Sequence, residues 1–233
     1  MKQSSIKDRS RSAVNLAQYN NLNNYDKLSK LKLEPPVDEQ FILRMLIKRP
    51  FGEFKLPNEL KWVHQMLMHA CAHQQYELNI HQPFCYITIR HGIVNTTTDD
   101  EWHVDGFSMN ITHLPEQNYI WCNNNPTQVA IKPFNIPYDF NHREHNLQLF
   151  LQDNIDNNSD VSSLDTETIY CLDPYIAHRR PVITESIHRT FIRISFTPIE
   201  IEDVNNTLNP LLETNYIRDG VKEFRNKLER YKK

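Results

Sequence analysis

The stretch Glu101-Trp102-His103-Val104-Asp105-Gly106-Phe107 contains a histidine and an aspartate two residues apart. In an extended chain alternate side chains point to the same face, so His103 and Asp105 are expected to project together. A second stretch, Tyr175-Ile176-Ala177-His178, supplies a later histidine. Two imidazole nitrogens and one carboxylate oxygen on one face of a metal leave three coordination positions open. The sequence therefore predicts a metal centre formed by His103, Asp105 and His178.

The composition of the whole chain is ordinary for one globular domain. Its 233 residues are 39% hydrophobic and 24% charged, and the net charge of -3 provides no overall attraction to nucleic acid or to an anionic membrane. The cysteines are well separated and form no C-x-x-C pair, which argues against a disulfide framework or a structural zinc site. We expect a cytoplasmic monomer or homodimer that binds neither nucleic acid nor a membrane.

The N-terminal third of the chain predicts a tail followed by helices. Residues 1–34 are polar and weakly periodic, so we expect a flexible arm ahead of a single domain over 35–233. Apolar side chains recur at helical spacing between Asp38 and Pro50, and again over 57–77. The apolar side of the first predicted helix comprises Phe41, Ile42, Met45 and Leu46. A last helix is expected after Asp219, near the C-terminus.

From Phe84 onward the chain is rich in β-branched and aromatic residues. Strands are predicted over 84–90, 101–109, 119–123, 127–131, 168–172, 176–183 and 189–198. Short strands that follow two helices, with no alternation of strand and helix, indicate an antiparallel barrel or sandwich with helices on one side. The long connection 138–167 contains a possible short helix over 144–151 and is expected to be either disordered or functional, for example as a lid.

The last predicted strand has two distinct faces. One carries Arg189, Phe191, Arg193 and Ser195, and the other carries Thr190, Ile192, Ile194 and Phe196, which are expected to pack against helices. The first face turns two guanidinium groups inward, where an unpaired charge would be very costly. A guanidinium can hold a carboxylate through two parallel hydrogen bonds, so we expect an anion in the interior. Pairing with internal Asp or Glu side chains is the alternative.

His103-x-Asp105, followed by His178, Arg189 and Ser195, resembles the iron(II)- and 2-oxoglutarate-dependent dioxygenase superfamily over about residues 84–198. The resemblance implies a double-stranded β-helix, or jelly-roll barrel, mainly β with flanking N-terminal and C-terminal helices. It also implies that the two histidines and the aspartate bind Fe(II), while Arg189 clamps the distal carboxylate of 2-oxoglutarate and O2 is the second reactant. The eleven-residue step from His178 to Arg189 is similar to that of the taurine dioxygenase-like and phytanoyl-CoA hydroxylase-like branches.

The same resemblance suggests further roles around the centre. Arg193 is similar in position to an arginine that meets an anionic group of the substrate in taurine dioxygenase-like members. Thr127 and Tyr119 would help to hold 2-oxoglutarate, and Trp121 would line the same pocket. Arg90 would face the substrate. Ordinary strand packing is the alternative for Thr127, Tyr119 and Trp121, and an exposed or core position is the alternative for Arg90.

The presence of Asp105 favours oxygen transfer, because the halogenating branch replaces this carboxylate with a small residue. The expected reaction hydroxylates an unactivated carbon of a small anionic or amino-acid-like substrate and releases succinate and carbon dioxide. Desaturation and ring formation are further outcomes of the same chemistry. A protein side-chain hydroxylase remains an alternative, as does a non-catalytic jelly-roll module. A cupin-like metal protein is another, in which His142 and His145 could serve as ligands.

Overall fold

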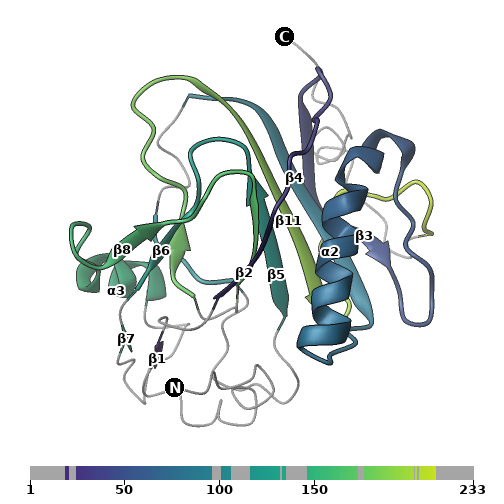
Figure 1. Ribbon diagram of the computed structural model, residues 1–233, viewed down its shortest axis with the longest axis horizontal. Helices are drawn as coiled ribbons and strands as arrows, with labels where there is room; N and C mark the ends of the chain where they lie inside the picture. The colour runs from purple at the N-terminus through teal and green to yellow at the C-terminus, as the bar shows by residue number, and fades with distance from the viewer. Residues whose placement is uncertain are drawn as a thin grey trace.

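The described part of the protein is built mainly of antiparallel strands, with helices against them (Figure 1). The computed structural model describes residues 19–20, 25–95, 101–105, 116–131, 133–134, 146–172, 176–201, 203 and 205–213. Its sheets are consistent with a β-sandwich or jelly-roll-like arrangement.

The elements follow one another in a mixed order. The strands are β1 (Tyr19–Asn20), β2 (Tyr25–Lys30), β3 (Gln40–Lys48), β4 (Phe84–Val94), β5 (Gln117–Cys122), β6 (Gln128–Ala130), β7 (Pro133–Phe134), β8 (Val161–Ser163), β9 (Thr168–Leu172), β10 (His178–Arg179) and β11 (Ile187–Thr197). The helical segments are the 3-10 helix η2 (Asn58–Val63), α2 (His64–Ala72), the π-helical turn η3 (His73–Glu77) and α3 (Leu147–Asn154). Among these residues, a six-stranded sheet has the order β2-β9-β5-β11-β4-β3, a second sheet the order β10-β6-β8, and β1 pairs with β7.

Strand β11 lies in the interior of the six-stranded sheet, between β4 and β5. Arg193 faces Thr88 of β4 on one side and Ile120 of β5 on the other. The alternation predicted for this strand is confirmed. Ile192, Ile194 and Phe196 join the main core, whereas Arg189, Phe191 and Arg193 line a pocket on the opposite face. The charged side chains of β11 are therefore held by the centre of the sheet.

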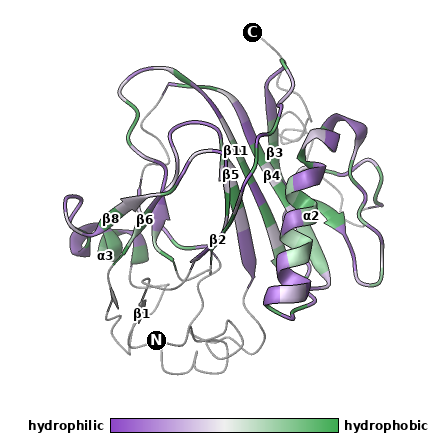
Figure 2. Ribbon diagram, in the orientation of Figure 1, coloured by the Kyte–Doolittle hydropathy of each residue, from purple (hydrophilic) through white to green (hydrophobic). Residues whose placement is uncertain are grey.

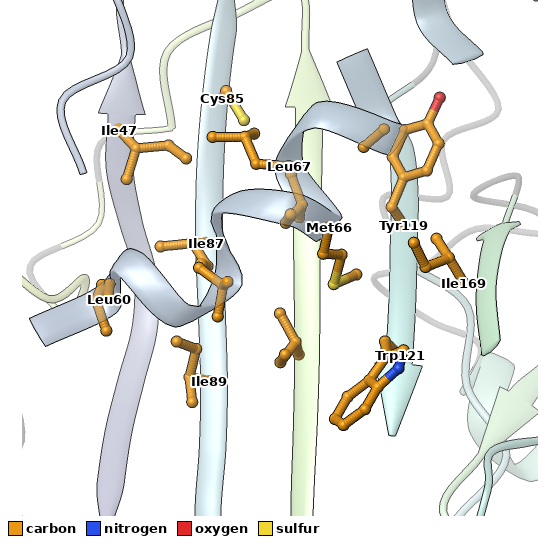
Figure 3. Close-up of a cluster of buried hydrophobic side chains, with 14 of the residues drawn as sticks. Ile47, Leu60, Met66, Leu67, Cys85, Ile87, Ile89, Tyr119, Trp121 and Ile169 are labelled. Atoms are coloured by element: carbon orange, nitrogen blue, oxygen red, sulfur yellow. The ribbon is translucent and has the colours of Figure 1, made fainter. Parts of the chain in front are cut away.

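The outer face of this sheet is covered by the segment η2–α2, which confirms the helix predicted over 57–77 (Figure 2). Leu60, Met66 and Leu67 are buried against the strands, close to Ile87 and Trp121 (Figure 3). The removal of these apolar side chains from water is the main contribution to the stability of the fold. The helix thus covers one face of the sheet, and the opposite face borders the pocket.

Replacing Leu67 with alanine is expected to destabilise the fold by about 2–5 kcal/mol, because it leaves a cavity between α2 and the sheet. The side chain is 2% exposed, whereas that of its neighbour Met68 is 53% exposed. Met68→Ala is the matched control and should change stability by no more than about 0.5 kcal/mol. Urea denaturation of both variants measures the difference. Equal effects would contradict this account of how the helix packs.

The helix predicted between Asp38 and Pro50 is wrong, because these residues form strand β3. The register of β3 against β4 shifts between Ile42 and Met45, and Arg44 has a φ of 40°. An inserted residue of this kind is a β-bulge, and it separates two side chains of the same face by three positions instead of two. Ile42 and Met45 therefore both reach the core under α2 with a spacing that imitates a helix.

The bulge is held by contacts that replace the regular backbone hydrogen bonds to β4. The backbone N–H of Leu43 donates to Oγ1 of Thr207 at 2.9 Å, and the N–H of Thr207 donates to the Leu43 carbonyl at 2.7 Å. The N–H of Arg44 donates to Oγ1 of Thr88 at 3.1 Å. Leu43 borders the pocket, whereas Ile42 and Met45 of the same strand pack in the core under α2.

The flexible arm predicted over 1–34 is wrong for its last part. Residues 25–30 form β2, which pairs with β9 at one edge of the six-stranded sheet. Leu31 and Leu33 are buried in the main core, and the carbonyl of Leu31 accepts a hydrogen bond from the indole N–H of Trp121 at 2.8 Å. A few apolar residues suffice to dock this polar stretch, because the edge of the sheet supplies backbone partners.

Other predictions are confirmed in part or fall outside the described residues. Helix α3 overlaps the short helix predicted over 144–151, and only His178–Arg179 of the predicted strand 176–183 pair as a strand. Residues 1–18, 21–24, 106–109, 138–145 and the helix after Asp219 lie outside the described part. No helix within the described ranges has both the length and the apolar character that a membrane span needs.

Candidate metal centre and pocket

His103 and His178 are brought together by a two-residue antiparallel bridge. The N–H of His103 donates to the carbonyl of His178 at 3.0 Å, and the reverse bond measures 2.9 Å. The imidazole centroids are 4.5 Å apart. Trp102 anchors this connection, because its side chain is 1% exposed and packs in a cluster with Leu151 of α3. The side chain of the next residue, His103, is thereby directed toward the pocket.

Both imidazoles are oriented by a carbonyl two residues earlier in the chain. Nδ1 of His103 lies 2.9 Å from the Glu101 carbonyl oxygen, and Nδ1 of His178 lies 2.9 Å from that of Ile176. A carbonyl can only accept, so each Nδ1 must carry the proton and donate it. This fixes the tautomer of both rings and leaves a lone pair on each Nε2, as in histidines that bind metals.

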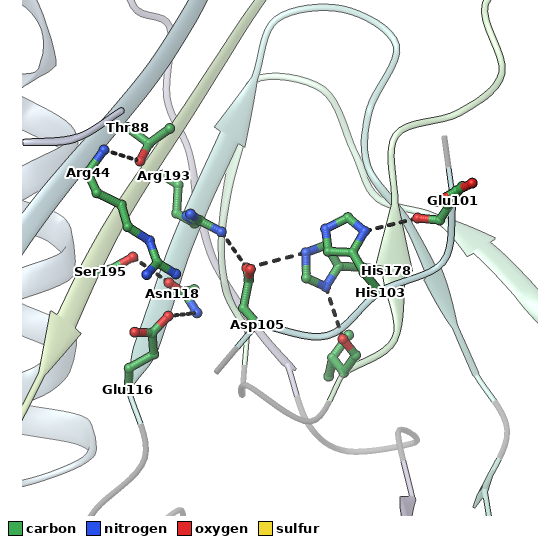
Figure 4. A network of polar contacts seen from close by, with 11 residues as sticks. Arg44, Thr88, Glu101, His103, Asp105, Glu116, Asn118, His178, Arg193 and Ser195 are labelled. Carbon is green, nitrogen blue, oxygen red and sulfur yellow. Dashed lines mark hydrogen bonds and ion pairs between the residues drawn. The ribbon is translucent and has the colours of Figure 1, made fainter. Parts of the chain in front are cut away.

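Asp105 completes the cluster. Its Oδ2 lies 3.4 Å from Nε2 of His178, and one ligand atom from each of His103, Asp105 and His178 lies within 4.8 Å of the others (Figure 4). The lone pair of a neutral imidazole nitrogen and a carboxylate oxygen repel each other at this separation, so a cation between them stabilises the arrangement. The three side chains could therefore hold a metal ion, as the sequence spacing predicts.

The charge states of the cluster also suit a metal. Burial, followed by the neighbouring His178, lowers the pKa of His103 to about 4, which leaves this imidazole neutral at neutral pH. Burial alone would raise the pKa of Asp105, but the neighbouring charge of Arg193 outweighs it and holds that pKa well below its usual range. A neutral nitrogen donor and an ionised oxygen donor are the forms that coordinate metals.

Arg193 binds the third member of this cluster. Its Nη1 donates to Oδ2 of Asp105 at 2.6 Å, and both side chains are 13% exposed. Burial alone would lower the pKa of Arg193, but the carboxylates of Asp105 and Glu116 outweigh it and raise that pKa. From the sequence, Arg193 was expected to meet an anionic group of the substrate, with an internal carboxylate as the alternative. The structure pairs it with the internal carboxylate of Asp105.

The cluster opens into a pocket of about 430 Å³ that also contains Arg189. This guanidinium is 5% exposed, and its Nε donates to the carbonyls of Asn124 at 3.2 Å and Asn125 at 3.0 Å. Burial lowers the pKa of Arg189, and Cys122 also contacts it. Within the described ranges no acidic side chain forms an ion pair with Arg189. A buried cation whose described hydrogen-bond partners are neutral carbonyls could bind an anion on its pocket side.

The other predicted site residues divide into two groups. Thr127 and Arg90 line the pocket, and their roles toward the cosubstrate and the substrate stay predictions. Tyr119 and Trp121 do not, so the expectation that they line it is wrong. Both belong to the core beneath α2, where the Tyr119 hydroxyl lies 3.0 Å from Nδ1 of His73. Strand β5 turns these two residues to the face of the sheet opposite the pocket.

Several residues that line the pocket were not anticipated from the sequence. They include Leu43, Thr88, Val94, Gln148, Arg179 and Arg180. Arg179 lies with its guanidinium carbon 4.5 Å from the centroid of Trp102, and its Nε donates to the side chain of Gln128 at 2.9 Å. Arg179 and Arg180 could have been predicted to line the pocket, because they directly follow the predicted metal ligand His178 in sequence.

No protein-family model and no curated protein matches the chain. Solved structures with partial similarity include AviO1 from Streptomyces viridochromogenes Tue57, with a TM-score of 0.38, 14% identity and coverage of 77% of this chain and 76% of that chain. HygX from Streptomyces hygroscopicus with iron bound has a TM-score of 0.37, 13% identity and coverage of 77% and 83%. HygX with nickel, 2-oxoglutarate and hygromycin B bound has a TM-score of 0.34, 12% identity and coverage of 70% and 76%. Similarity at this level does not by itself define a function.

Proposed function

We propose that the protein is an Fe(II)- and 2-oxoglutarate-dependent oxygenase with a double-stranded β-helix fold. The observation that carries the proposal is the cluster of His103, Asp105 and His178, which opens into the same pocket as the buried guanidinium of Arg189. A metal site alone would be compatible with many activities. A metal site beside a cation that has no acidic partner in the described chain selects for an anionic ligand that also binds the metal.

The donor set fits iron. Two imidazoles and one carboxylate on one side of the ion are the ligands of the non-haem Fe(II) oxygenases, and they leave positions for a cosubstrate and for oxygen. When bound, Fe(II) supplies oxygen activation coupled to the oxidation of 2-oxoglutarate. The residues of this chain supply the rest. Hydrogen bonds to the carbonyls of Glu101 and Ile176 fix the two imidazoles.

The second anchor for 2-oxoglutarate is Arg189. A dicarboxylate that binds a metal through one end can place its other carboxylate against a guanidinium in a two-point contact. The hydrogen bonds from Nε to Asn124 and Asn125 hold this side chain before the ligand arrives, so little conformational freedom is lost on binding. Thr127 is buried in the same pocket and offers a hydroxyl to the cosubstrate.

The substrate class follows from the rest of the lining. Arg90, Arg179 and Arg180 border the pocket together with a single described acid, Glu101. Basic side chains around a pocket of this volume favour a small molecule with an anionic group, such as an acid or an amino-acid-like compound. With the carboxylate of Asp105 in place, the reaction we propose is hydroxylation of an unactivated carbon.

Succinate formation tests the proposal. The purified protein, supplied with Fe(II), 2-oxoglutarate and air, would be incubated with a library of amino acids, organic acids and phosphorylated metabolites, and succinate would be measured by NMR. Succinate above the background of His178→Ala, stimulated by members of the library, is the expected result. If no compound in the library raises succinate above the His178→Ala background, the oxygenase assignment is overturned.

A further inference from the structure

We propose that Arg193 is the positioning residue of Asp105, so that it sets the metal affinity of the centre. The inference rests on the metal centre of the proposed function, but it does not depend on 2-oxoglutarate or on turnover. It also replaces the role in substrate binding that the sequence analysis assigned to Arg193.

Arg193 contacts the carboxylate oxygen of Asp105 that also faces His178. Nη1 of Arg193 lies 2.6 Å from Oδ2 of Asp105, and the same oxygen lies 3.4 Å from Nε2 of His178 (Figure 4). Arg193 and His178 thus approach the carboxylate from two sides, as the picture shows. A charge-assisted hydrogen bond of this length is strong and directional. It fixes the rotation of the carboxylate relative to the histidines.

The position of Arg193 is itself rigid. It lies in the interior of the sheet, where Thr88 and Ile120 are its partners on the two neighbouring strands. Its Nε is fully buried and has no hydrogen-bond partner among the described residues, whereas its Nη1 donates to Asp105. A guanidinium on a fixed backbone that is hydrogen-bonded to Asp105 can hold that carboxylate in a single orientation.

Asp105 needs such support more than the histidines do. Each imidazole is oriented by a backbone carbonyl close in sequence, whereas Asp105 precedes residues outside the described part and takes its support from Arg193, 88 positions away. A buried carboxylate without a partner would not keep one orientation. Among the described residues, Asp105 therefore takes its support from a distant strand, whereas each histidine takes its support from its own segment.

The test compares Mn(II) affinity after Arg193→Met and Arg193→Lys, measured by isothermal titration in the absence of 2-oxoglutarate and substrate. Loss of an outer partner of a metal ligand typically weakens metal binding about 10–100-fold, and we expect Arg193→Met to fall in this range. Lysine restores a cation and one donor, so it should recover part of the affinity. Arg49→Met is the matched control, because it removes an arginine that pairs with another carboxylate, that of Glu200 at 3.2 Å, and that does not line the pocket.

A visible absorption spectrum distinguishes a change in the position of the Asp105 carboxylate from a general loss of structure. With Co(II) in place of Mn(II), the visible absorption of Arg193→Met should differ from wild type, since the carboxylate changes its coordination. Thermal unfolding after chelation shows whether each variant is folded, and Arg193→Gln provides a second neutral variant if methionine prevents folding. Affinity in the neutral variants equal to or tighter than wild type would overturn the proposal. Absence of Mn(II) binding in the wild type would instead overturn the metal centre, and this inference with it.

Discussion

Replacing His178 with alanine is expected to weaken metal binding by at least about 100-fold. Residues that only hold a metal ligand in place already contribute about 10–100-fold to metal affinity, so the loss of a ligand itself should cost more. His178 supplies one of the ligand atoms of the cluster, and its Nε2 faces Oδ2 of Asp105 at 3.4 Å. Without this ring the remaining nitrogen and oxygen form an incomplete donor set. Isothermal titration with Mn(II) measures the change directly.

His188→Ala is the matched control for this experiment. His188 is an exposed residue of β11, and its ring packs against His91 at 4.8 Å between centroids, away from the cluster. Loss of this imidazole should leave the affinity for Mn(II) unchanged. If both alanine variants bind Mn(II) like the wild type, the metal lies elsewhere and the assignment of the cluster is wrong.

Replacing Arg189 with methionine is expected to weaken 2-oxoglutarate binding by at least about 100-fold while sparing the metal. Two hydrogen bonds to a charged partner contribute roughly 1.5–3 kcal/mol each, and about 1.4 kcal/mol corresponds to a tenfold change in affinity. Methionine fills much of the volume but offers no donor. Titration of 2-oxoglutarate into the Mn(II)-loaded protein without oxygen measures the effect.

Arg189→Lys separates the charge of this residue from its geometry. A lysine ammonium keeps the charge but cannot make two parallel hydrogen bonds, so its affinity for 2-oxoglutarate should lie between those of wild type and Arg189→Met. Mn(II) binding should stay within about twofold of wild type in both variants, because the described hydrogen bonds of Arg189 go to Asn124 and Asn125 and not to the cluster. A methionine variant that binds 2-oxoglutarate normally would remove this residue from the cosubstrate site.

Much of the site could be predicted because its residues lie on strands with clear alternation. Strand β11 separates Ile192 and Ile194 from Arg189 and Arg193, so its sequence alone defines which face is buried in the core and which is charged. The two-residue spacing of His103 and Asp105 was equally informative, although their segment forms only an isolated bridge and no strand. Their convergence also required two distant segments to pair, which the family resemblance suggested and periodicity could not.

Strand β5 was harder to interpret. Every residue from Gln117 to Cys122 is buried, so its sequence shows no alternation that would tell the pocket side from the core side. Its pairing with β11 decides the matter, since Tyr119 faces Ile194 and Trp121 faces Ile192. Register across a sheet is a tertiary property, and it turned both aromatic residues away from the site.

Bulges and edge pairing explain the remaining errors. The bulge at Arg44 gave β3 a helix-like spacing, and its support by Thr207 comes from a residue far along the chain. The polar segment that forms β2 pairs with the backbone of β9 at the edge of the sheet. The availability of that edge cannot be read from the sequence of β2 itself. In each case the deciding partner lies more than 100 positions away in sequence.

The most direct test of the account is an anaerobic titration of the Fe(II)-loaded protein with 2-oxoglutarate, followed by visible absorption. A cosubstrate that binds the iron of this centre through its keto acid end should produce a weak charge-transfer band, which saturates with 2-oxoglutarate and requires His178. A wild-type protein that binds both components without developing the band would contradict the central claim that His103, Asp105 and His178 hold the iron to which 2-oxoglutarate binds.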